Sequence, residues 1–207
     1  MPIISKYKLK SPHKLRWEWY DTFLSNNTLQ INRILHVDAF DSFFFGDPFS
    51  LIPKNDEIYF QSEEKAIKSC SYNKQWLLDC HPNVTKEFLR NKILCSGSLA
   101  GGRDPFHKFV KMMISAEEWS GCWKKGSDQG DFNYIFWKNY KSFPYRINIM
   151  NCSSGFTTMH YCTNKSRLFN SKNQLVAKGS DNPIIYSHQY NRYEEVVDYI
   201  NSLCPKS

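Results

Sequence analysis

Short apolar segments alternate with helix-like segments along this chain, and this alternation constrains its fold more than any other feature. The apolar segments have the length of buried strands: 31–37, 57–61, 92–95, 145–150 and 184–186. The other segments space their apolar side chains as helices do: 14–25, 103–119, 128–137 and 193–203. Strands that alternate with helices predict an α/β layer fold, in which ligands bind beyond the carboxyl ends of the strands.

The composition is that of one globular domain. A chain of 207 residues can bury a substantial core, and we expect residues 1–207 to form a single domain. Hydrophobic residues make up 41% and charged residues 23%, as is ordinary for a soluble protein. Aromatic residues reach 16%, which favours a core built on large rings over a surface that stacks on sugars or bases.

The formal net charge is +7, and much of the excess lies in an early stretch without acidic residues: Lys6, Lys8, Lys10, Lys14 and Arg16. A basic protein attracts anions, including nucleic acid, membrane surfaces and nucleotide diphosphates. A solvated basic face is the simpler interpretation, because the sequence has no RRM, KH or zinc pattern. We therefore expect no nucleic acid among the partners.

The apolar segments and the cysteines indicate the cellular compartment in which the protein would be found. No segment approaches the ~20 apolar residues of a membrane-spanning helix, and no charged start followed by an apolar run marks a secretory signal. As written, the sequence predicts a cytoplasmic protein without a membrane span, or a protein of the Golgi or secretory lumen if an upstream anchor has been lost. Seven cysteines without a C-x-x-C pair predict free thiols in a reducing compartment.

Two carboxylates follow the first predicted strand. Asp38 and Asp41 lie on a turn after residues 31–37, and the aromatic residues 43–45 would brace that turn. Mn²⁺ and Mg²⁺ prefer carboxylate ligands, and such a cation neutralises the charge that develops on a diphosphate leaving group. One of the two carboxylates can instead accept hydrogen bonds from ribose. The alternative interpretation is a turn in which an aspartate only caps a helix.

Two further polar segments adjoin predicted helices. Residues 95–102, Cys-Ser-Gly-Ser-Leu-Ala-Gly-Gly, predict a glycine-rich turn between a strand and a helix, where backbone N–H groups can approach a ligand. Ser127 is a natural N-cap for the helix at 128–137, and the helix dipole favours Asp128 in its first turn. Asn133, one turn further on, would face the same cleft. The alternative interpretations are a tight turn without a ligand for the first segment and, for the second, a plain helix N-cap, which is the favoured interpretation when the segment is considered alone.

A late histidine, His188, follows the last predicted strand. Neutral imidazole is a good ligand for Mn²⁺ and would complete a carboxylate site. Arg192, four residues further on, would meet phosphate. The alternative interpretation is that His188 is a buried histidine with a structural role only. We expect such a structural role for four other histidines: His36, His81, His107 and His160.

The ordered motifs resemble those of the GT-A glycosyltransferases over about residues 14–200: Asp38-x-x-Asp41 with Asp47-Pro48-Phe49, Cys95-Ser96-Gly97, Asp128-Gln129 and His188-Gln189-Tyr190-Asn191-Arg192. Phe40 replaces a residue that is usually basic there, and Asn191 stands where Asp is common. The resemblance implies a GT-A-like mixed sheet flanked by helices. In that family a βα unit carrying the nucleotide-base pocket usually precedes a helix such as 14–25, so an N-terminally truncated or reduced chain is also implied.

The resemblance further implies a metal-dependent enzyme that moves a sugar from a UDP- or GDP-sugar donor to a hydroxyl of a glycan or other acceptor, using Mn²⁺ or Mg²⁺. Asp38, Asp41 and His188 would bind the metal, and Asp128 would be catalytic, orienting sugar or acceptor. The expected donor contacts are Asp38, Ser96, Gly97, Ser98, Gln129 and Arg192. Three other interpretations stay open: a non-catalytic GT-A-like binding or scaffold domain, a basic nucleic-acid-binding module, and a metal-dependent phosphohydrolase, whose usual two-metal pattern is missing.

Overall fold

The computed structural model describes residues 12–26, 29–120, 122, 124, 127–164 and 166–204, apart from the side chains of Ser120 and Ser127. The basic residues Lys6, Lys8 and Lys10 and the expected N-cap side chain of Ser127 therefore lie outside the described residues.

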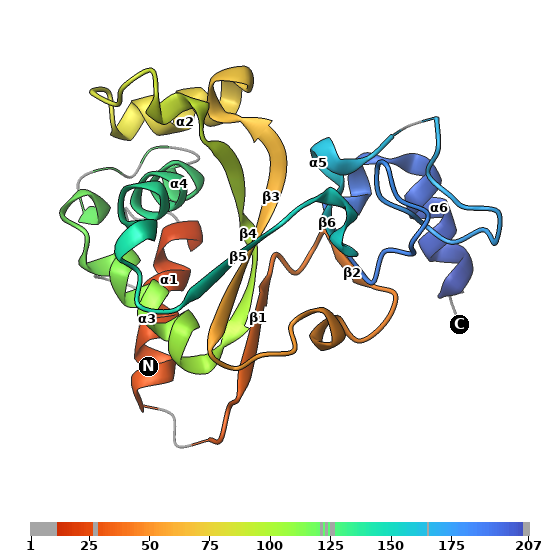
Figure 1. Cartoon of the computed structure of the whole chain (residues 1–207), viewed down its shortest axis with the longest axis horizontal. Coiled ribbons are helices and arrows are strands. Elements are labelled where there is room, and N and C mark those ends of the chain that lie inside the picture. Colours follow the sequence, from red (N-terminus) through yellow and green to blue (C-terminus); the bar gives the residue numbers. More distant parts are fainter. Residues whose placement is uncertain are drawn as a thin grey trace.

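A four-stranded mixed sheet lies at the centre of the molecule (Figure 1). Its strands, in spatial order, are β1 (Arg33–Val37), β4 (Lys92–Gly102), β3 (Glu57–Ala66) and β5 (Arg146–Met150). β4 runs antiparallel to both of its neighbours, whereas β3 and β5 are parallel. The expected mixed sheet flanked by helices is confirmed at this level.

Helices cover one face of this sheet. Figure 1 shows α1 (Pro12–Asn26), α3 (Arg103–Ser115) and α4 (Ser127–Asn139) together on that side, with α2 (Ser71–Cys80) packed against α4. The core between helices and sheet is largely aromatic: Trp17, Phe60, Phe109, Phe132 and Phe136 are all buried. The expectation of a core built on large rings is therefore confirmed. Burial of each such ring stabilises the fold by roughly 1.5–3 kcal/mol.

A buried ion pair fixes α1 on α4. Lys14 is fully buried, and its ammonium donates to Asp131 Oδ2 over 2.6 Å and to the Trp119 carbonyl over 2.6 Å. Asp131 also lies 2.7 Å from His81 Nε2. Because a buried charge is tolerated only when it is paired, these contacts restrict where the first turns of α1 can lie.

A second, smaller sheet lies on the other side of the large one (Figure 1). Its order is β2 (Ser42–Phe44), β7 (Tyr186–His188) and β6 (Phe156–Thr158), and α5 (Met159–Cys162) and α6 (Glu194–Leu203) accompany it. Phe156 and Tyr186 stack with ring centroids 4.4 Å apart and pack with Tyr59 and Ala100 of the large sheet. One-turn 3₁₀ segments occupy several connections: Pro48–Leu51, Ile67–Ser69, Phe88–Arg90, Glu117–Ser120, Tyr140–Ser142, Cys152–Ser154 and Tyr190–Arg192.

The glycine-rich segment after residue 95 is not a turn. β4 continues without interruption to Gly102, and its glycines allow β3 and the preceding loop to approach closely. A Cβ at Gly102 would lie 1.6 Å from the Asn55 carbonyl oxygen, and one at Gly101 would lie 2.9 Å from the Glu57 carbonyl oxygen. Pairing with strands on both sides therefore overrides the local turn signal.

Other elements differ from the prediction in their bounds. The helix expected over 103–119 ends at Ser115, and the strand expected at 184–186 is found at Tyr186–His188. The sequence patterns missed α2, β2, β6 and α5. Three of these are only three or four residues long, too short to carry a period.

Four of the seven cysteines form disulfides, so the expectation of free thiols is wrong for them. The bonds join Cys80 to Cys122 and Cys152 to Cys162. The free thiols are Cys70, Cys95 and Cys204, the first two of them buried. Separations of 42 and 10 residues carry no motif, so the pairing follows only from where the fold brings the cysteines together.

Within the described residues, no helix combines the length and apolar character needed to cross a bilayer. α1 has 15 residues and contains several charged side chains, whereas a span needs ~20 mostly apolar ones.

Candidate metal centre and its cavity

Backbone pairing brings three predicted ligands together. Asp38 follows β1, and its N–H donates to the Gly97 carbonyl of β4 over 3.0 Å. Asp41 precedes β2, and its carbonyl accepts from the Gln189 N–H over 2.7 Å. β2 pairs with β7, which ends at His188. The end of one sheet and the paired edge of the other thus converge at one point.

The three side chains offer ligand atoms that all lie within 4.8 Å of one another. His188 Nε2 is 3.3 Å from Asp41 Oδ1 and 3.7 Å from Asp38 Oδ2. Asp41 Oδ1 and His188 Nε2 are buried and lack a hydrogen-bond partner of good geometry among the described residues. Because unpartnered buried polar atoms are costly, a shared cation fits this arrangement. Two carboxylates and one imidazole suit Mn²⁺ or Mg²⁺.

The carboxylates control the protonation of His188. Burial would lower the pKa of the imidazole, but Cys95 and the two carboxylates outweigh burial and hold that pKa well above its ordinary value. Burial would raise the pKa of Asp38, but His188 and the Arg16 guanidinium outweigh it and lower that pKa. A proton on His188 therefore competes with a cation, and cation affinity should rise with pH.

Two residues of β4 shape the site from behind. A Cβ at Gly97 would lie 2.3 Å from Asp38 Oδ2 and 2.9 Å from His188 Cε1, so only glycine leaves room for both side chains. Cys95 Sγ lies 3.2 Å from His188 Nδ1. An Nδ1–H that donates to this sulfur leaves Nε2 free to face the carboxylates, which is the tautomer that metal binding needs.

Arg16 of α1 links Asp38 to Asp128 of α4. Its guanidinium donates to Asp38 Oδ1 over 2.5 Å and to Asp128 Oδ2 over 3.2 Å. The same group donates to the Ser96 carbonyl over 3.1 Å, and the Ser96 hydroxyl lies 3.3 Å from Asp128 Oδ2. Arg16 thus occupies one oxygen of Asp38 and leaves the other directed towards His188.

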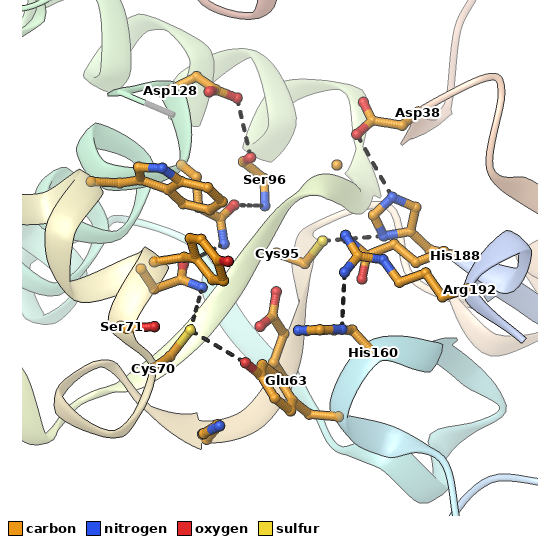
Figure 2. Close-up of a pocket in the computed structure, with 18 of the residues that line it drawn as sticks. Asp38, Glu63, Cys70, Ser71, Cys95, Ser96, Asp128, His160, His188 and Arg192 are labelled. Atoms are coloured by element: carbon orange, nitrogen blue, oxygen red, sulfur yellow. Dashed lines mark hydrogen bonds and ion pairs between the residues drawn. The ribbon is translucent and has the colours of Figure 1, made fainter. Parts of the chain in front are cut away.

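Asp38, Ser96 and Asp128 line one end of a cavity of about 680 Å³ (Figure 2). Its lining includes most of the predicted site residues: Asp38, Ser96, Gly97, Asp128, Gln129, His188 and Arg192. Asp41 borders His188 outside this lining, and Ser98 is fully buried in the β1–β4 ladder, away from the cavity. Asp47 caps the 3₁₀ segment Pro48–Leu51 through the Phe49 N–H.

The amides of α4 hold β4 at the site. Gln129 Oε1 accepts from the Ser96 N–H over 2.7 Å, while Nε2 donates to the Leu94 carbonyl and to Asn73 Oδ1, each over 3.1 Å. Asn133 binds both the N–H and the carbonyl of Leu94. Gln129 and Asn133 therefore position the strand, and the amide N–H groups of Gln129 are already engaged by the protein.

Three of the histidines outside the triad serve structure, as expected. His36 Nε2 lies 2.9 Å from the Ser96 carbonyl, which only accepts, and burial lowers the pKa of this imidazole to about 3. His81 pairs with Asp131, and His107 Nε2 lies 2.8 Å from Asp21 Oδ1.

The other end of the cavity holds groups that the sequence patterns did not indicate. Glu63 is only 4% exposed, its Oε2 has no hydrogen-bond partner among the described residues, and burial raises the pKa of its carboxyl to about 7. Arg192 lies 3.0 Å from His160 Nδ1, so this histidine lines the cavity rather than serving the core. Cys70 Sγ lies 3.3 Å from the Tyr161 hydroxyl.

No protein-family model matches this chain, and no curated protein matches its sequence. The residues and their geometry therefore carry the functional argument. Sequence reasoning missed Arg16, Cys95 and Glu63 as members of the site. A partial signal existed for Cys95, which opens the glycine-rich segment. Arg16 lay in a basic stretch that has a simpler interpretation, and Glu63 lay just beyond the strand predicted at 57–61.

Proposed function

We propose that this protein is a metal-dependent glycosyltransferase with a GT-A-like fold, which moves a sugar from a UDP- or GDP-sugar to an acceptor hydroxyl. One observation carries the proposal. Asp41 Oδ1 and His188 Nε2 are buried and lie 3.3 Å apart without a hydrogen bond of good geometry, and both are close to Asp38 Oδ2 at the end of a large cavity. This donor set suits a hard divalent cation that retains open positions for diphosphate oxygens.

The chain's own residues would divide the work. Asp38, Asp41 and His188 would hold Mn²⁺ or Mg²⁺, which neutralises charge on the departing diphosphate when bound. Arg16 keeps Asp38 ionised and oriented, and with Asp128 it forms a charged wall beside the metal ligands. Catalysis would then depend on positioning and on stabilising the charge of the leaving group.

The rival functions have less support in the described residues. A two-metal phosphohydrolase needs a second cluster of metal ligands. Among the described residues, the group formed by Asp38, Asp41 and His188 is the one cluster of three or more ligating side chains. A nucleic-acid module would use exposed basic and aromatic side chains, whereas Arg16 is engaged in the site and the main aromatic cluster is buried in the core. The two disulfides also favour an oxidising secretory lumen over the cytoplasm.

Release of nucleoside diphosphate tests the proposal. A panel of UDP- and GDP-sugars is incubated with the protein in Mn²⁺ or in EDTA, with and without saccharide acceptors. We expect release only with Mn²⁺, and a loss of ~10²-fold or more in His188→Ala, because the metal contributes several kcal/mol. His107→Ala, which removes a histidine outside the cavity, should keep the activity. The proposal is abandoned if no donor is cleaved or if EDTA and His188→Ala change nothing.

A further inference from the structure

The carboxylate of Glu63 occupies the part of the cavity away from the metal ligands. Figure 2 shows it rising from β3 between Cys70 and Cys95, with His160 beside it and Asp38 on the far side of His188. The side chain lines the cavity and is 4% exposed, and its Oε2 has no hydrogen-bond partner among the described residues. A buried hydrogen-bond acceptor that faces a cavity and has no partner in the protein indicates that a ligand supplies the hydrogen-bond donor.

The surroundings of Glu63 limit what that donor can be. A metal ion needs further ligands, and Glu63 is not part of the one cluster of ligating atoms found among the described residues. An ammonium group is disfavoured, because Lys65, Arg192 and His188 all act on Glu63 as positive charges. An anion would be repelled by the carboxylate itself. Neutral hydroxyl groups meet these conditions.

The same cavity offers an apolar surface at its rim. Tyr72 and Trp76 both line it, their ring centroids are 6.1 Å apart, and Tyr72 is 69% exposed. A pyranose ring combines hydroxyl donors at its edge with apolar C–H groups on its face. An acceptor at Glu63 and aromatic rings elsewhere in the lining of the same cavity match both parts of such a ring.

We propose that this cavity contains a saccharide-binding subsite in which Glu63 accepts hydrogen bonds from ring hydroxyls and Trp76 packs against the ring face. The assignment of that saccharide as the acceptor substrate rests on the proposed transferase function, but saccharide binding itself does not. His160 and Arg192, which bind each other between Glu63 and His188, would separate this subsite from the metal centre.

Binding of simple glycosides tests the subsite. The probes are the methyl glycosides of glucose, galactose, mannose, xylose and N-acetylglucosamine, screened by saturation-transfer NMR and then titrated. We expect at least one to bind with millimolar affinity. Glu63→Gln should weaken that affinity about tenfold or more, because it removes a charged acceptor. Trp76→Ala should also weaken it, whereas Glu64→Gln, which makes the same change at the exposed neighbouring residue, should not.

Two results would overturn the subsite: no glycoside binds the wild-type protein, or the glycosides bind Glu63→Gln and wild type equally. Asp41→Ala separates this inference from the proposed function, because it should lose Mn²⁺ binding and keep glycoside binding. If no nucleotide sugar is cleaved but Glu63→Gln still loses glycoside binding, the transferase proposal fails and the subsite stands. If donors are cleaved while Glu63→Gln binds glycosides normally, the subsite alone fails.

Discussion

Replacing Glu63 by glutamine should remove a pH-dependent cost from folding. Burial raises the pKa of this carboxyl from 4.5 to about 7. Between these two values the folded protein keeps a proton that the unfolded chain has lost. Stability therefore falls as pH rises through this window, and the full cost of the buried charge is present above about pH 7.

The expected magnitude follows from the raised pKa. One pH unit corresponds to ~1.36 kcal/mol, so an ionised Glu63 costs about 3 kcal/mol relative to a freely solvated carboxylate. Most of this cost, about 2–3 kcal/mol, should develop between pH ~5 and pH ~8.5. The side chain is only 4% exposed, so solvent does little to reduce the effect.

Urea unfolding with the disulfides intact measures this effect. The free energies of unfolding of wild type, Glu63→Gln and Glu64→Gln are compared at the two pH values. Other titrating groups contribute alike to all three proteins, so the difference between wild type and Glu63→Gln isolates Glu63. Wild type and Glu64→Gln should lose about 2–3 kcal/mol more than Glu63→Gln on going to the higher pH. An equal loss in all three proteins would refute the reasoning.

Three further changes should have separable effects. Gly97→Ala should weaken Mn²⁺ binding at least tenfold, as measured by electron paramagnetic resonance, because its Cβ would overlap a ligand carboxylate. Gly46→Ala is the control, because the nearest atom to its Cβ would lie at an ordinary contact distance of 3.5 Å, and it should not weaken binding. Equal Mn²⁺ binding by both variants would show that the site can accommodate the extra methyl group. Asp128→Asn should cut turnover by ~10²-fold with little change in melting temperature if its charge positions a substrate, and near wild-type turnover would leave it a structural role. Replacing Cys80 and Cys122 by serine should lower the free energy of unfolding by roughly 2–4 kcal/mol in a urea titration, because their disulfide closes a 42-residue separation, and an unchanged value would mean that the bond does not form.

Local patterns in the sequence were enough for the elements that depend on local signals. α1 and α4 lie close to their predicted bounds, because their apolar spacing and their ends are encoded within one segment. β4 was cut short because its glycines signal a turn locally, while their actual use is close contact with neighbouring segments. The disulfides escaped prediction for a related reason, since each joins cysteines that only the fold brings together.

The candidate metal ligands could be predicted because Asp38, Asp41 and His188 each adjoin a strand end, and strand ends converge in layered folds. The residues that position these ligands could not be predicted. Arg16 reaches Asp38 from a helix that the buried ion pair of Lys14 helps to fix, and the sequence does not distinguish such a residue from a solvated basic one. The resemblance to GT-A enzymes stays a proposal, supported by the mixed sheet and the ligand cluster.

Titration with Mn²⁺ by isothermal calorimetry, at pH ~7.5 and again at pH ~8.5, tests the central claim most directly, because the cation must displace the proton on His188 and should bind more tightly at the higher pH. Asp41→Ala removes one of the three ligands, and Asp56→Ala removes an exposed aspartate elsewhere as a matched control. Circular dichroism of each variant establishes that it is folded. The metal centre predicts a single site in wild type and in Asp56→Ala that is lost in Asp41→Ala. The absence of Mn²⁺ binding in wild type, or equal affinity in all three proteins, would contradict it.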